Sequence, residues 1–95
     1  MTENLRIGDV IYIFVDPPLM VQPLLMKLTV GYLGAESFIV EGYKHMTDGE
    51  YYYDDINISW YKTLGAARKS IREQFGSKTK IQWYKTGNWS IHVRE

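Results

Sequence analysis

The sequence predicts an α+β domain, in which a small, strongly bent antiparallel β-barrel of about five strands precedes one α-helix and a C-terminal β-hairpin. The first observation is a series of β-branched and aromatic runs between residues 9 and 61, separated by turn-forming residues. The second is one segment, 64–75, with apolar residues at helical spacing. The third is a pair of alternating runs on either side of Thr86-Gly87-Asn88, a turn signal between two strands.

The first predicted strand is Asp9–Val15, an apolar run whose lack of alternation indicates that both faces are covered. Pro17 and Pro18 end this strand because proline has no backbone N–H to donate, and residues 16–23 are predicted to form a loop. Strand 24–33 alternates, with an apolar face made of Leu24, Met26, Leu28, Val30 and Tyr32. Turn signals separate the remaining predicted strands, which cover 38–43, 50–54 and 58–61.

The predicted helix covers 64–75 and has a signal at each end. Thr63 is the predicted N-cap, because its hydroxyl can accept from a free N–H of the first turn. Gly76 is the predicted left-handed C-terminal cap. One stripe of the helix carries its apolar residues, Leu64, Ala67, Ile71 and Phe75. The hairpin that follows is predicted from strands over 80–85 and 89–93.

A chain of 95 residues allows one domain, 1–95, which we divide into a barrel-like part (6–62), a helix (63–76) and a hairpin (79–95). Its 11 basic and 11 acidic residues cancel, which excludes a strongly basic nucleic-acid binder as a description of the whole chain. The absence of cysteine excludes disulfides and Cys-based zinc sites. The N-terminus lacks a signal-peptide pattern, and the longest apolar run is too short to span a membrane. We therefore expect a cytoplasmic location and no membrane partner.

The charges are segregated along the chain. Residues 36–55 carry six acidic residues and one basic residue, whereas residues 61–85 carry seven basic residues and one acidic residue. The sequence has no phosphate-cradling glycine loop, and Asp48, Glu50, Asp54 and Asp55 lack the spacing of a Ca²⁺ loop. His45 and His92 have no carboxylate at a spacing that would orient them. We therefore predict that the protein is not an enzyme and has no metal site or cofactor.

Aromatic residues make up 15% of the chain, and the simplest expectation places Trp60, Trp83 and Trp89 in the core. Strand alternation directs Tyr52 to the face opposite Tyr51 and Tyr53. A small barrel has a single inner face, so some of these rings are expected outside, where tyrosine is a typical interface anchor.

Several segments carry a resemblance to a known group of proteins, in this order: Ile7–Tyr12, Thr29-Val30 paired with Phe38–Val40, Tyr51–Asp55, and Trp60–Leu64 with Ala67. Over residues 6–75 the chain resembles short, uncharacterised proteins of bacteriophages and Gram-positive bacteria with a Src-homology-three-like barrel and a C-terminal helix. Gly65-Ala66 departs from that pattern, which has two acidic residues there, and the hairpin over 79–95 lies beyond it. The resemblance implies a small barrel and a phage source, and it implies no catalytic residues.

The expected function is a non-enzymatic protein-binding module whose partner is a host or cellular protein. With the phage source that the resemblance implies, it becomes an inhibitor of a host protein, of the anti-defence or anti-CRISPR type, that works in the host cytoplasm by occluding a surface. Carboxylates would mimic phosphates on a surface that normally binds nucleic acid, and tyrosines would anchor the contact. The predicted partner-binding residues are Glu41, Asp48, Glu50, Tyr51, Tyr52, Tyr53, Asp54 and Asp55, with Glu36 beside them.

Two alternatives remain open from the sequence. The first is a nucleic-acid-binding accessory protein that uses a basic helix-hairpin face made of Arg68, Lys69, Arg72, Lys78, Lys80 and Tyr84. The second is self-association, for instance as a homodimer, through an edge strand or through the apolar loop residues Leu19, Met20 and Val21.

Overall fold

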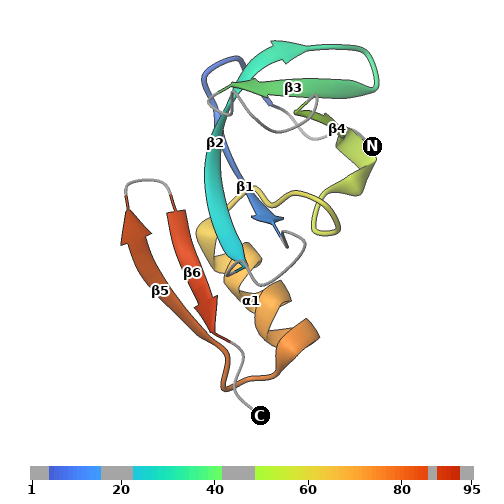
Figure 1. Cartoon of the computed structure of the whole chain (residues 1–95). Coiled ribbons are helices and arrows are strands. Elements are labelled where there is room, and N and C mark those ends of the chain that lie inside the picture. The colour runs from blue at the N-terminus through green and yellow to red at the C-terminus, as the bar shows by residue number, and fades with distance from the viewer. Residues whose placement is uncertain (1–4, 16–22, 42–48, 86–87, 93–95) are drawn as a thin grey trace.

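The structure is a computed structural model that describes residues 5–15, 23–41, 49–85 and 88–92. Within these ranges the chain forms an antiparallel sheet of six strands, a 3₁₀ helix and one α-helix (Figure 1). In chain order these elements are β1 (Val10–Val15), β2 (Leu24–Leu33), β3 (Ser37–Glu41), β4 (Glu50–Tyr52), η1 (Tyr53–Asp55), α1 (Leu64–Phe75), β5 (Lys80–Lys85) and β6 (Asn88–His92). The predicted α+β class is confirmed.

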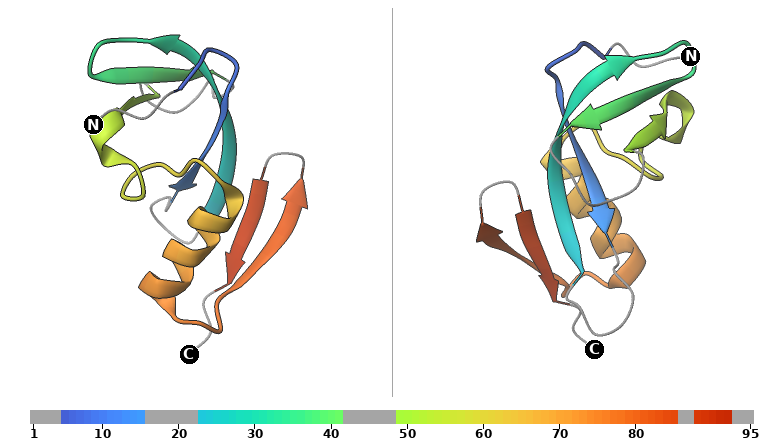
Figure 2. Two further views of the ribbon diagram at one scale, coloured as in Figure 1. Left: turned by 180° about the vertical axis from the view of Figure 1, so that it is seen from behind. Right: turned by 45° about the horizontal axis from the view of Figure 1, so that its top comes forward.

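The long strand β2 organises the whole sheet. On one edge it pairs with β1, from Val10 opposite Thr29 to Val15 opposite Leu24. Its other edge is shared, because β3 pairs with 29–33 and β6 pairs with 24–26. The strand order is therefore β4-β3-β2-β6-β5, with β1 beside β2. Two views show the consequence, an upper part made of β2, β3 and β4 and a lower part that holds α1 and the β5–β6 hairpin (Figure 2).

After η1 the chain returns to β1. Tyr12 and Tyr61 exchange two backbone hydrogen bonds, each of 2.8 Å. The strand predicted over 58–61 is reduced to this bridge and a second one between Trp60 and Ile56, because the N–H groups of Ile58 and Ser59 both turn back to the carbonyl of Asp55 at 2.9 Å. Among the described residues the sheet is strongly bent but does not close, so the predicted barrel is not confirmed.

A bulge at Gly31 reverses the alternation of β2. The pairing with β3 shifts register between Val30 and Tyr32, so that Tyr32 lies opposite Ile39 and Leu33 lies opposite the buried Phe38. The prediction that Tyr32 lies on the same face as Val30 is therefore wrong, and the Tyr32 side chain is 60% exposed. Glycine fits the bulge, because a Cβ atom at Gly31 would collide with the exposed side chain of Glu41 unless that side chain moved.

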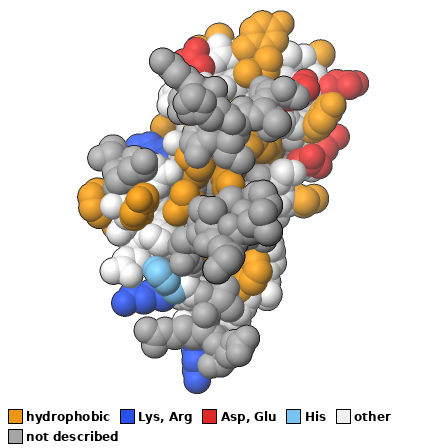
Figure 3. Space-filling model, in the orientation of Figure 1, with side chains coloured by type: hydrophobic (Ala, Val, Ile, Leu, Met, Phe, Trp, Pro, Cys, Tyr) orange, Lys and Arg blue, Asp and Glu red, His pale blue; other side chains and the backbone are white. Residues whose placement is uncertain are grey.

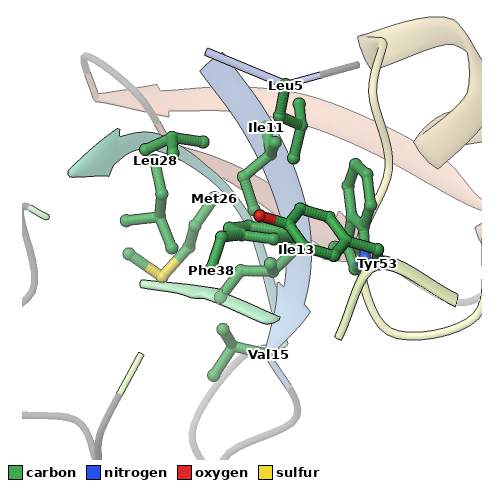
Figure 4. Close-up of a cluster of buried hydrophobic side chains, with 10 residues drawn as sticks. Leu5, Ile11, Ile13, Val15, Met26, Leu28, Phe38 and Tyr53 are labelled. Carbon is green, nitrogen blue, oxygen red and sulfur yellow. The ribbon is translucent and has the colours of Figure 1, made fainter. Parts of the chain in front are cut away.

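The sheet separates two hydrophobic clusters, and β1 contributes to both. Ile11, Ile13 and Val15 enter the upper cluster, and Figure 4 shows them around Phe38 with Leu5, Met26, Leu28 and Tyr53. Tyr12 and Phe14 lie on the other side, against the lower cluster that α1 covers. The prediction that both faces of this strand are covered is confirmed.

Aromatic rings fill the upper cluster around Phe38. The ring of Trp60 meets it edge-on at 5.0 Å between centroids, and the rings of Tyr53 and Tyr51 lie at 5.6 and 6.1 Å. The polar atoms of the buried rings are satisfied, because Trp60 Nε1 donates to the carbonyl of Tyr52 and the Tyr53 hydroxyl donates to the carbonyl of Gly34, both at 2.8 Å.

The helix has the bounds that the sequence predicts. Thr63 Oγ1 accepts from the Ala66 N–H at 3.1 Å, which confirms the N-cap. Gly76 ends the helix with a positive φ of 111°, but its ψ of 149° is extended rather than left-handed helical. Ala67 and Ile71 are buried against the sheet.

The hairpin of β5 and β6 joins the sheet through β6, where Trp89 pairs with Leu25. Ile91 is buried in the lower cluster, and the Trp89 ring lies 5.9 Å from that of Tyr12. Trp83, opposite Trp89, is 64% exposed, so its predicted place in the core is wrong. Trp83 is exposed because the end of β5 diverges from α1, so the helix does not cover that part of the strand (Figures 1 and 2).

Candidate functional site

The outer face of β2, β3 and β4 exposes a row of large apolar side chains. Tyr32 lies opposite Ile39 and Ile39 lies opposite Glu50, while Tyr52 lies opposite Ser37 in the next row. Adjacent strands are about 4.8 Å apart, so these side chains are close neighbours. Tyr32, Ile39 and Tyr52 are 60%, 41% and 52% exposed. Contiguous exposure of this kind is typical of interaction surfaces.

Carboxylates surround this row. Glu41 follows Ile39 by two positions and therefore lies on the same face, Glu50 ends the row on β4, Glu36 lies in the turn before β3, and Asp54 lies in η1. The Ser37 hydroxyl donates to Glu50 Oε2 at 2.6 Å, which fixes that carboxylate. We call the exposed set the acidic–aromatic face, and it consists of Tyr32, Ile39, Tyr52, Glu36, Glu41, Glu50 and Asp54. In Figure 3 hydrophobic and acidic side chains gather together at the upper right.

The predicted tyrosine cluster is divided between this face and the core. Tyr53 is buried, and Tyr51 is half-buried with its ring stacked on Phe38. Burial raises the pKa of the Tyr51 phenol above its ordinary value of 10.0. Of the three, only Tyr52 is exposed, because the rings of Tyr51 and Tyr53 pack around Phe38. Tyr52 is therefore the tyrosine of this cluster that is most accessible to a partner.

Of the predicted partner-binding residues, the structure places Glu41, Glu50 and Tyr52 on the outer face of β3 and β4 and leaves Asp54 exposed in the adjoining η1. Asp55 is half-buried, and its carbonyl organises the turn that leads to Trp60. Several predicted features lie outside the described residues, namely Asp48, His45 and the apolar loop residues Leu19, Met20 and Val21.

Sequence reasoning missed Tyr32 and Ile39. For Tyr32 the available signal was Gly31, because an isolated glycine inside a strand pattern often marks a bulge. Ile39 lies between Phe38 and Val40 in β3, so strand alternation places its side chain on the outer face if Phe38 is buried on the inner face.

The predicted basic face is not one surface. Arg68, Lys69 and Arg72 lie on α1, and Lys78 follows in the connection to β5. Lys80 precedes Ile81, which packs toward α1 in the lower cluster, so Lys80 lies on the hairpin face turned away from the helix. Tyr84 is 58% exposed at the register shift between Trp83 and Lys85. The exposed His92 lies opposite Lys80 at the same end of the hairpin.

Among the described residues, no three His, Asp or Glu side chains lie close enough together to hold a metal ion. No helix in the described part of the chain is long and apolar enough to cross a membrane. Comparisons of the chain with protein-family models, curated proteins and solved structures gave no match.

Proposed function

We propose that this protein is a non-enzymatic protein-binding module and that the acidic–aromatic face is its contact surface. One observation carries the proposal: Tyr32, Ile39 and Tyr52 are exposed side by side on three paired strands and are surrounded by carboxylates. Interfaces place a few large, apolar anchors at their centre and polar groups around them. A solvated sheet face that served only to cover the core would not need three such side chains.

The face is held in place from below, which supports its role in binding. Phe38 and Val40 alternate with Ile39 and pack in the upper cluster. The buried face of β3 therefore holds the strand, and with it the exposed Ile39, in place. The hydrogen bond from Trp60 to the carbonyl of Tyr52 fixes the end of β4. A surface that is already ordered loses little conformational entropy when a partner binds.

The chemistry of the face favours a basic protein surface as its partner. Glutamate and aspartate carboxylates pair with lysine and arginine, and tyrosine rings accept contacts from guanidinium groups. A surface that normally binds nucleic acid carries these cations, and the carboxylates would take the place of its phosphates. We extend the proposal to a phage-encoded inhibitor of a host protein, of the anti-defence or anti-CRISPR type, that acts by occlusion in the host cytoplasm.

We also propose that the upper part is a small barrel of the Src-homology-three-like kind. The support is the order of its elements. A long bent strand is shared between two halves, a 3₁₀ helix follows β4, and the chain then returns to β1 through Tyr12 and Tyr61.

The experiment is affinity capture from a bacterial host lysate with the wild-type chain, Tyr52→Ser and Tyr84→Ser. The control is matched, because Tyr84 is 58% exposed and Tyr52 is 52% exposed. A central anchor contributes about 2 kcal/mol or more, so Tyr52→Ser should weaken a captured complex at least about 30-fold, while Tyr84→Ser should leave it unchanged. Capture that is insensitive to Tyr52→Ser and to Glu50→Lys would remove the proposal. Binding of a labelled oligonucleotide at low salt would instead favour the nucleic-acid alternative, and a dimer in sedimentation would favour self-association.

A further inference from the structure

A shallow groove of about 550 Å³ lies along one side of α1, away from the acidic–aromatic face. It is lined by Gly65, Arg68, Lys69, Arg72, Glu73 and Ser77. Gly65 lies at the start of the groove, where a Cβ atom would meet no neighbour within 4 Å, so this end of the groove is open. We propose that this groove binds the phosphate group of a small phosphorylated molecule, a role that is separate from the proposed protein contact.

The cations of the groove lie close together and lack counter-ions. Arg68 and Arg72 are separated by four residues, and Lys69 and Arg72 by three, so their side chains are neighbours on the helix surface. Among the described residues, none of the three cations is within ion-pair distance of a carboxylate, and this includes Glu73 on the same lining. Three unpaired like charges within one helical turn repel one another, and a bound dianion would relieve this repulsion.

Two further observations point to a ligand. Arg72 Nε donates to the carbonyl of Thr79 at 3.3 Å, which holds this side chain between α1 and β5. Arg68 Nε is buried and has no hydrogen-bond partner among the described residues. Because this nitrogen has no acceptor among the described residues, a ligand that binds the Arg68 guanidinium breaks no existing hydrogen bond at Nε. Guanidinium groups match phosphate oxygens with paired N–H donors.

The size of the site favours a small molecule over nucleic acid. The three cations occupy a single turn of one helix, whereas nucleic-acid surfaces follow the backbone over many phosphates. Lys80, which would extend such a track, lies on the hairpin face turned away from α1. The ligand class is therefore a compact phosphate ester or diphosphate.

The test is an amide-shift NMR titration of the full chain with pyrophosphate and with ADP, at constant ionic strength. We expect saturable shifts at residues 65–73 and 77, with no change on β3 and β4. The variant Lys69→Gln should weaken pyrophosphate binding about tenfold, because a charge-assisted contact is lost. The matched control Lys78→Gln removes an exposed lysine outside the groove and should change binding less than about twofold.

Three outcomes would overturn the inference. The first is a response that does not saturate and is equal for Lys69→Gln and Lys78→Gln. Such a response would show that anions only accumulate nonspecifically around the positively charged helix. The second is the absence of any shift at residues 65–73. The third is tighter binding of a single-stranded oligonucleotide with shifts that reach Lys80 and Tyr84, which would show an extended nucleic-acid surface. None of these outcomes depends on whether the acidic–aromatic face binds a protein.

Discussion

Replacing Trp60 by phenylalanine should destabilise the protein far more than the same replacement at Trp83. Trp60 is completely buried, its ring meets that of Phe38 at 5.0 Å, and its Nε1 donates to the carbonyl of Tyr52 at 2.8 Å. Trp83 is 64% exposed near the end of β5. Because the chemical change is identical, the comparison isolates the effect of the surroundings.

The magnitude follows from two losses. A phenylalanine cannot make the hydrogen bond to Tyr52, which contributes about 1 kcal/mol to the free energy of unfolding. The smaller ring also leaves unfilled space beside Phe38, with a cost of about 1–2 kcal/mol. We therefore expect Trp60→Phe to lower the free energy of unfolding by about 2–3 kcal/mol. For a domain of this size the melting temperature falls by about 4–8 °C per kcal/mol, which gives a decrease of about 8–24 °C.

Thermal and urea unfolding followed by circular dichroism would measure both variants. Trp83→Phe should stay within about 0.5 kcal/mol of the wild type, as expected for an exposed position. A difference between the two variants of less than about 1 kcal/mol would refute the placement of Trp60 as a fully buried ring of the upper cluster.

Three further predictions concern stability. Gly65→Ala should raise the free energy of unfolding by about 0.5–1 kcal/mol in urea unfolding, because the added Cβ atom would meet nothing within 4 Å. Gly76→Ala should lower the free energy of unfolding, because φ at this position is 111°. Thr63→Ala should cost about 1 kcal/mol in the same assay, because the Ala66 N–H loses its acceptor at 3.1 Å; no loss would argue against this cap. The pKa of Tyr51 is raised above 10.0 by burial, so the fold favours the neutral phenol, and this contribution is complete below pH 10 and lost as the pH rises through the folded-state value. The melting temperature of the wild type should therefore fall more steeply above pH 10 than that of Tyr51→Phe, and parallel curves would contradict this assignment.

Elements with strong local signals could be predicted from the sequence. The bounds of α1 and β2 follow from apolar spacing and turn residues, and Thr63 shows that a cap can be read from one hydroxyl before an apolar stripe. The segment over 58–61 had the composition of a strand, but Asp55 accepts two N–H groups there and turns the chain instead. That competition depends on contacts that composition does not contain.

The candidate face was predicted only in part, for the same reason. Its carboxylates follow from the acidic stretch of the sequence, and Tyr52 follows from alternation. Tyr32 could not be placed without the register shift at Gly31, which reverses the face of the strand on which Tyr32 lies. Trp83 shows the opposite case, because it lies on the same strand face as Ile81 but at a point that no described helix or strand covers.

The most direct test of the proposed contact surface is hydrogen exchange of the chain alone and in complex with a protein captured from host lysate. We expect added protection over 29–33, 37–41 and 50–54, with little change in α1. Protection confined to α1 and β5, with the acidic–aromatic face unchanged, would contradict this expectation.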